Sequence, residues 1–128
     1  MKSPTRYQPN DKPSLDSNCA PMGVILYYAD GNEEIIHVNE QLLKLFECVD
    51  FDEFLAHTGG TFQGMVCSED LESVKDSIQG QITHQDDMGH IRYRIRTKRG
   101  KLVNVIAYGR LVRREGGLRP YYNVFNMQ

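Results

Sequence analysis

The chain has 128 residues, 40% of them hydrophobic and 25% charged, which is enough apolar material for one globular domain with a modest core. Its formal net charge is −2 at pH 7 and its isoelectric point is near 6.1. Because neutralising a phosphate backbone normally requires a clear basic excess, this balance argues against a general nucleic-acid-binding protein.

The cysteine content and the hydropathy pattern point to one compartment. The three cysteines, Cys19, Cys48 and Cys67, are an odd number and their spacing matches no zinc signature, so we expect reduced thiols. No run approaches the roughly 20 apolar residues of a membrane span, and the polar first residues lack the apolar centre of a signal peptide. We therefore expect a cytoplasmic protein with no membrane segment in this sequence.

The chain divides by composition into a tail and one domain. Residues 1–22 hold four of the five prolines among many polar residues, a composition that buries little surface and is typical of a flexible tail or linker. From Gly23 to Tyr28 the sequence is rich in β-branched and aromatic residues, and a second such run covers 34–38 after an Asp-Gly turn. These two runs predict a β-hairpin, and we expect the folded domain to cover residues 23–127.

Two short helices are expected next. Asn39 is suited to cap the first helix, and Gly59 and Gly60 are placed to end the second, which is predicted over 51–57. The apolar residues of these helices fall on one face of each, as expected for helices that cover a core: Leu42, Leu43, Leu45 and Phe46 in the first, and Phe51, Phe54 and Leu55 in the second.

A third helix is predicted from Ser68, whose side-chain oxygen is suited to cap it, with the acidic residues Glu69 and Asp70 at the positive end of the helix dipole. Apolar residues then recur at helical spacing up to Ile78, and Gly80 is placed to end the helix. We expect this helix to pack on a sheet.

Three strands complete the chain. Residues 90–97 alternate between apolar and arginine side chains, which predicts a strand with one face on a core and the other in water. A tight turn leads to 102–112, which is apolar enough on both faces for a central strand, and 119–127 gives a last strand. This order predicts an α+β fold in which a five-stranded antiparallel sheet is covered on one face by short helices.

Three sequence words in this order resemble a PAS domain of the bacterial signalling type. They are I-I-H-V-N-E-Q-L-L-K-L-F, F-Q-G-M-V-C-S-E-D-L-E-S-V and Y-R-I-R-T-K-R-G-K-L-V-N-V. The chain departs from the family pattern at Cys67-Ser68, where His-Pro is usual, at Arg99, where the turn usually has Asp, and at Asn104, where tryptophan is common. The resemblance covers essentially residues 23–127 and implies a PAS-like fold.

The resemblance also implies a function. PAS domains of this style precede diguanylate cyclase (GGDEF), cyclic-di-GMP phosphodiesterase or histidine kinase domains, so we expect a non-catalytic sensory and dimerisation module with an output domain after Gln128. We expect the signal to pass through the last strand, Tyr121 to Met127. The run from Leu102 to Val112 is the expected contact with a second copy in a homodimer.

The fold can offer a small-molecule cavity between the helices and the sheet, in which tyrosine hydroxyls or Asn104 would orient a ligand. A plain filled core is the favoured alternative, because a domain this small needs most of its apolar side chains for stability. Flavin is disfavoured because the chain lacks the Asn-Cys-Arg-Phe-Leu word, and haem because no histidine lies within 69–79; the cofactor is unknown. The expected lining residues are Phe46, Phe54, Phe62, Val74, Ile78, Tyr93, Asn104, Tyr108 and Tyr122.

Two charged segments suggest other functions. The segment from His84 to His90 is a weak metal site through His84, Asp87 and His90, and it gives the alternative of a small stand-alone α+β metal-binding protein or enzyme; a polar loop is the simpler interpretation. The arginines and lysines of 92–101 suggest phosphate binding, but their alternation is what a solvated strand produces, so nucleic acid is disfavoured. A better use of these cations would be to dock an acidic surface of a partner domain.

Overall fold

The computed structural model describes residues 22–82 and 87–128, with side chains placed for 22–81 and 90–128. Its elements in chain order are β1 (Gly23–Tyr28), β2 (Ile35–Val38), α1 (Glu40–Leu45), α2 (Phe51–Thr58), the 3-10 turn η1 (Phe62–Gly64), α3 (Ser68–Ile82), β3 (Asp87–Arg96), β4 (Leu102–Val112) and β5 (Tyr121–Met127).

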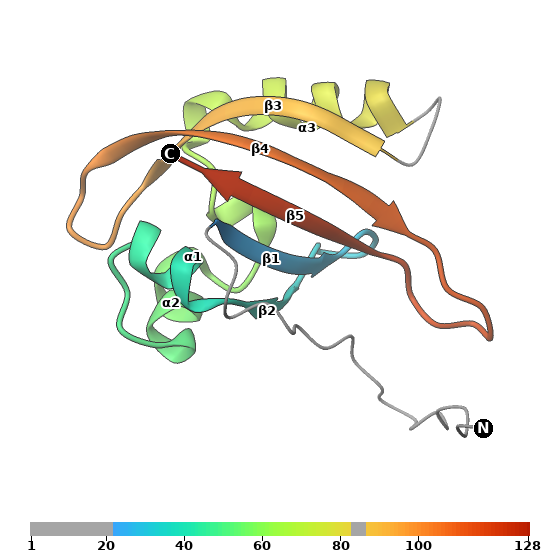
Figure 1. The fold of residues 1–128 in the computed structure, drawn as a ribbon, viewed down its shortest axis with the longest axis horizontal. Helices are drawn as coiled ribbons and strands as arrows, with labels where there is room; N and C mark the ends of the chain where they lie inside the picture. The colour runs from blue at the N-terminus through green and yellow to red at the C-terminus, as the bar shows by residue number, and fades with distance from the viewer. Residues whose placement is uncertain (1–21, 83–86) are drawn as a thin grey trace.

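The strands form one antiparallel sheet in the order β2-β1-β5-β4-β3, which confirms the predicted five-stranded sheet (Figure 1). The first and last strands of the domain are neighbours, because Gly23 of β1 lies opposite Asn126 of β5. The sheet therefore holds the start and the end of the domain side by side.

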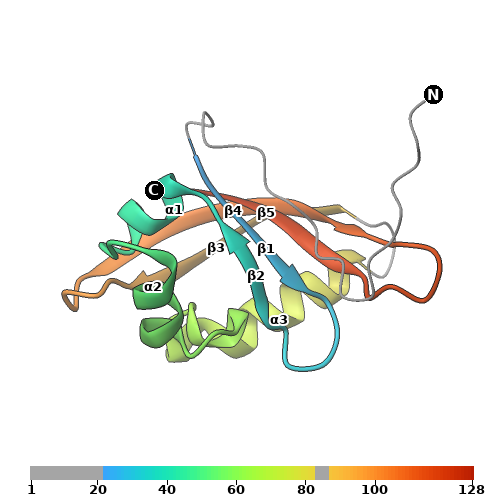
Figure 2. The same ribbon diagram turned by 90° about the horizontal axis from the view of Figure 1, so that it is seen from below.

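The helices cover one face of this sheet. In Figure 2 α2 and α3 lie on the same side of the strands. Phe54 of α2, Phe62 of η1, and Val74 and Ile78 of α3 are buried in one apolar cluster with the inward side chains of the strands. Burial of these side chains is the main force that holds helices and sheet together.

Asn39 joins α1 to β1. Its side-chain Oδ1 accepts hydrogen bonds from the backbone amides of Leu42 (3.1 Å) and Val24 (2.8 Å), and its Nδ2 donates to the carbonyl of Met22 (3.1 Å). The residue is only 1% exposed. The predicted cap is thus confirmed, and it also fixes the position of the first strand relative to the helix.

Both predicted ends of the third helix are wrong by a small amount. α3 begins at Ser68 itself, so the residue before the helix is Cys67 and not the predicted cap Ser68. At the other end α3 continues through Gly80 to Ile82. A glycine ends a helix by adopting a positive φ, and Gly80 is not among the residues that do so. An exposed glycine within a helix costs only about 1 kcal/mol, which the packing of Val74 and Ile78 offsets.

Candidate functional site

The space between helices and sheet is filled by side chains. Tyr27, which the sequence interpretation did not include, is fully buried at the centre of this region, and so is Met65. The seven predicted lining residues found in the same buried cluster are Phe46, Phe54, Phe62, Val74, Ile78, Tyr93 and Tyr122.

Two predicted lining residues lie elsewhere. The inward positions of β4 are odd-numbered, such as Val105 and Ala107, and the even-numbered positions face the other side. Asn104 and Tyr108 are therefore exposed on the outer face of the sheet, with Tyr108 41% exposed. Because successive side chains of a strand point to opposite faces, the prediction was wrong for both residues at once.

Aromatic rings occupy the centre of the core. The rings of Tyr27 and Phe62 are stacked, with centroids 4.5 Å apart and planes 7° from parallel. Tyr122 lies against Tyr27 at 5.1 Å, and Tyr93 meets Phe62 edge to face at 6.2 Å. Aromatic rings in direct contact therefore make up the centre of the core.

The aromatic core nevertheless contains polar groups. The hydroxyl of Tyr93 donates a 2.6 Å hydrogen bond to Oδ1 of Asn126, whose side chain is 2% exposed. Within the described residues, the Tyr27 hydroxyl and Nδ2 of Asn126 have no hydrogen-bond partner. Burial raises the pKa of both tyrosines, so both hydroxyls are neutral at physiological pH. Unpaired buried groups of this kind are positions where water or a ligand completes the hydrogen bonding.

Glu33 adds a carboxylate near this core. It lies in the β1–β2 turn with a positive φ of 59°, and its Oε1 is buried without a hydrogen-bond partner in the part of the chain described. Burial raises the pKa of this carboxyl, against the opposing effects of Lys75 and of a hydrogen bond from Gln63. Its charge also raises the pKa of Tyr27, although less than burial and Tyr93 do.

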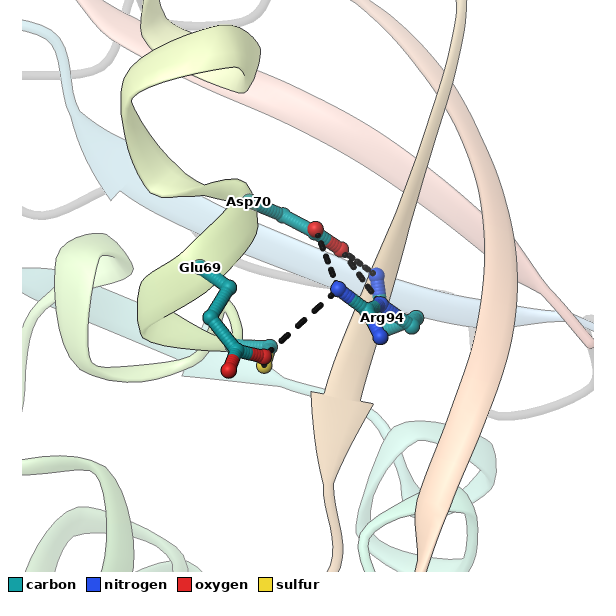
Figure 3. A network of polar contacts seen from close by, with 4 residues as sticks. Glu69, Asp70 and Arg94 are labelled. Atoms are coloured by element: carbon teal, nitrogen blue, oxygen red, sulfur yellow. Dashed lines mark hydrogen bonds and ion pairs between the residues drawn. The ribbon is translucent and has the colours of Figure 1, made fainter.

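A charged pair fastens α3 to the edge of the sheet (Figure 3). Asp70 accepts hydrogen bonds from the guanidinium of Arg94 at 2.8 and 3.0 Å and from the Arg94 backbone amide at 2.9 Å. The carbonyl of Arg94 accepts from the amide of Cys67 at 2.8 Å. Hydrogen bonds from Arg94 hold the pKa of Asp70 below its usual range. Nη2 of Arg94 also lies 3.7 Å from Oε1 of Glu69. The pair is a positioning element, because both carboxylate oxygens of Asp70 accept hydrogen bonds from Arg94.

Beside this pair runs a groove of about 380 Å³. Charged, neutral polar and apolar side chains all contribute to its wall. Its lining residues are Asp70, Ser73, Val74, Arg92, Tyr93, Arg94, Asn104, Val105, Ile106 and Gln128.

The predicted metal site is mostly outside the described side chains. His84 lies outside the described residues, and the side chain of Asp87 is also not described. His90 is exposed, with its ring 5.4 Å from the ring of Tyr108. No cluster of His, Cys, Asp or Glu suited to a metal ion occurs among the residues that the structure describes.

The comparisons with known proteins agree with this geometry. Residues 35–125 match the family model of the PAS fold. The chain belongs to the PAS family. This match confirms the resemblance that the three sequence motifs indicated. The helices and the sheet of the PAS domain form the α+β fold that the resemblance implied. No curated protein matches the chain.

Solved structures of PAS domains share this fold at low sequence identity. A PAS domain from a two-component sensor histidine kinase matches with a TM-score of 0.66 and 15% identity, covering 86% of each chain. A PAS domain from Colwellia psychrerythraea matches with a TM-score of 0.68 and 12% identity, over 87% of this chain and 88% of the other. A third, from a LuxR-family transcriptional regulator of Burkholderia thailandensis in complex with ethanol, has a TM-score of 0.63 and 18% identity over 88% and 98%.

Among the described residues, none of the helices covers the outer face of the PAS sheet. Large apolar side chains are exposed on it, with Leu102 46%, Tyr108 41% and Met127 48% exposed.

Across the described segments, no helix has both the length and the apolar content needed to cross a membrane.

Proposed function

We propose that this PAS domain is a non-catalytic sensory module of bacterial signal transduction that regulates an output domain from the cytoplasm. The match to the PAS family over residues 35–125 supports a signalling role, and PAS domains commonly dimerise and pair with output domains. A histidine kinase or a cyclic-di-GMP enzyme is the proposed output, because the sequence style resembles PAS domains that precede them.

The observation that carries the sensory part is the position of Asn126. Its side chain accepts a hydrogen bond from Tyr93 inside the core, while the next residue of β5, Met127, is 48% exposed at the end of the strand. A change in the core that alters this hydrogen bond acts directly on the last strand. The proposed signal is a shift between two packings of this strand, driven by a ligand that binds one of them better.

The proposed ligand is small, neutral and able to form hydrogen bonds. The unpaired Tyr27 hydroxyl offers both a donor and an acceptor, and Nδ2 of Asn126 offers a donor. The stacked rings around them favour a molecule with an apolar part. The ethanol complex of the Burkholderia thailandensis PAS domain is an example of a ligand of this size in a related fold.

Native mass spectrometry tests this proposal. The purified protein is compared under native and denaturing conditions, with an absorption spectrum recorded on the same sample. A mass excess that disappears on denaturation, and that is lost in Tyr27→Phe, is the expected result. An apo mass in all samples, before and after incubation with small alcohols, would remove the ligand from the proposal.

The same spectra report the oligomeric state. The sequence predicts a homodimer through Leu102 to Val112, and the exposed outer face of β4 leaves that surface open.

The stand-alone metal-binding protein or enzyme that uses the His84–His90 segment stays a prediction, since no described contact favours it; loss of function on mutating His84 and Asp87 would revive it.

A further inference from the structure

A hollow of about 300 Å³ lies where the start and the end of the domain meet α1. Three parts of the chain form its wall: the residues at the start of β1, the helix α1, and the end of β5. The hollow has the volume of about ten water molecules, which is enough for a small organic ligand. The residues that line it are Met22, Gly23, Gln41, Lys44, Leu45, Asn126, Met127 and Gln128.

Close contacts hold the strand and the helix on two sides of this hollow. A Cβ added to Gly23 would lie 2.8 Å from Cδ1 of Leu42 in α1, so the glycine allows β1 to approach the helix this closely. Asn39 fixes the same junction, because its Nδ2 donates to the carbonyl of Met22 at 3.1 Å and its Oδ1 accepts from the amide of Val24 at 2.8 Å. The wall of the hollow is therefore set by the fold and not by a single side chain.

Asn126 presents its side chain on the side of the sheet where α1 lies. It is opposite Gly23 in the antiparallel pairing of β1 and β5, and residues opposite each other point to the same face. Since a Cβ on Gly23 would contact α1, the side chain of Asn126 lies on that face too. Its Oδ1 accepts from Tyr93, whereas its Nδ2 is buried without a partner among the described residues. A buried donor that lacks an acceptor thus belongs to a residue of the wall.

The charge of this hollow is positive. Lys44, in the last turn of α1, is exposed and is the one ionisable side chain among the lining residues. No described carboxylate forms an ion pair with it, including Glu40 one turn earlier in the helix. Two other hollows differ, because the groove beside β3 includes Asp70 and the hollow at the start of α3 includes Glu69. A ligand beside α1 therefore meets a cation and side-chain amides but no acidic side chain of the wall.

We propose that this hollow binds a small organic carboxylate. One carboxylate oxygen accepts from the Lys44 ammonium and the other from Nδ2 of Asn126, while a short apolar part packs on Leu45. A single lysine matches the one negative charge of a carboxylate, whereas arginine is the usual choice for phosphate.

The bound carboxylate would tie the end of β5 to α1 and so favour one position of the last strand. This regulatory effect rests on the proposed function, in which β5 carries the signal; the binding itself does not. Nδ2 of Asn126 is the one group that the hollow shares with the proposed interior ligand. The other partner of that ligand, the Tyr27 hydroxyl, is not part of the wall.

Butyrate and butyramide test the proposal on the full chain, because they have nearly the same shape and only butyrate is charged. Each is titrated to about 50 mM into isotope-labelled protein, with NaCl keeping the ionic strength constant. The signals followed by NMR are the side-chain amide of Asn126 and the backbone amides of Gly23 and Leu45. We expect saturable shifts with butyrate, with a dissociation constant of about 1–10 mM, and at least about fivefold weaker binding of butyramide.

Two variants make the test specific to the hollow. Lys44→Gln removes the exposed cation and is expected to weaken butyrate binding at least about threefold while leaving butyramide unchanged. Asn126→Asp keeps an acceptor for Tyr93 but replaces the donor by a carboxylate, and is expected to abolish the butyrate shifts. The matched control Lys75→Gln removes a cation from α3, outside the hollow, and is expected to keep the original affinity. Circular dichroism checks that each variant is folded, and the exposed Lys44 keeps the test decisive if Asn126→Asp is not.

Four results would each overturn the proposal. The first is the absence of saturable shifts of these signals with butyrate. The second is equal affinity for butyrate and butyramide, which would mean that the hollow does not select a carboxylate. The third is an unchanged butyrate affinity in Lys44→Gln, which would place the anion elsewhere. The fourth is tighter binding of inorganic phosphate than of butyrate, which would assign the hollow to another class of anion.

Tyr27→Phe separates this test from that of the interior ligand. The variant is expected to lose the mass excess of the sensory proposal and to keep the butyrate shifts, because Tyr27 does not line the hollow. Each of the two proposals therefore stands or fails on its own measurement.

Discussion

The two faces of the sheet are built from the same strands but have different surroundings. On the inner face, side chains such as Ile25, Tyr27 and Val105 are at most 1% exposed beneath the helices. On the outer face, Tyr108 and Met127 are equally apolar in character and are more than 40% exposed. Hydrophobicity alone therefore does not define the core of this domain. What defines it is which side of the strands receives α2, η1 and α3.

The largest expected difference between the faces concerns stability. Phe54→Ala removes a fully buried ring that meets Phe46 edge to face, and is expected to lower the free energy of unfolding by about 3–5 kcal/mol. Tyr108→Ala on the outer face is expected to cost less than about 1 kcal/mol. Urea denaturation followed by circular dichroism measures both. Similar losses for the two variants would mean that the outer face is also covered in solution.

Helix caps give the next largest contrast, between a buried cap and an exposed one. Asn39→Ala leaves the buried amide of Val24 without its partner, and is expected to cost about 2–3 kcal/mol. Asp50, which caps α2 by accepting from the Glu53 amide at 2.8 Å, is exposed, and Asp50→Ala is expected to cost about 1 kcal/mol. Equal costs in urea titrations would contradict the role of Asn39 in holding β1.

A smaller contrast lies within the inner face, between two tyrosines. Tyr93→Phe removes the hydrogen bond to Asn126 and is expected to cost about 1–3 kcal/mol. Tyr27→Phe removes a hydroxyl without a partner among the described residues and is expected to change the free energy of unfolding by less than about 0.5 kcal/mol, or to raise it. If Tyr27→Phe proves as costly as Tyr93→Phe, then the hydroxyl has a bound partner, which would favour an internal ligand or water.

The smallest effect is a pH dependence at the edge where the faces meet. Asp70 has a folded-state pKa below its ordinary value of about 3.9, so its stabilising contribution is complete above that value and is lost as the pH falls through the lowered pKa. Thermal unfolding from about pH 5 down to about pH 2.5 should show a smaller drop in Tm for Asp70→Asn than for the wild-type chain. Parallel curves would show that the pair with Arg94 adds no acid sensitivity.

Much of the fold could be predicted because local signals and the final contacts agree. The period of two along 90–97 and the helical period after Ser68 each place their apolar side chains toward the same core. The cap at Asn39 was also predictable, since an Asn before an apolar helical face is a local signal. What the local signal did not reveal is that the same side chain also binds β1, a contact made only in the folded sheet.

The candidate site was harder to predict. In β4 both faces are apolar, so the sequence alone does not say which parity points inward, and Tyr108 was assigned to the wrong side. The inward position of Tyr27 has the same ambiguity, because β1 is apolar throughout. The pair of Asp70 and Arg94 joins residues 24 positions apart and depends on α3 lying along the edge of β3.

The pairing of Gly23 with Asn126 has a consequence for protein engineering. Because β1 and β5 are adjacent, a short linker can join residue 22 to residue 128 without crossing the sheet. New ends can then be opened in the β4–β5 connection at Gly116 and Gly117, which have positive φ and no neighbouring atom within 4 Å of an added Cβ. A circular permutant made in this way would start with β5 and end with β4 while keeping the same sheet, so the order in which the strands are synthesised could be separated from the fold that they reach.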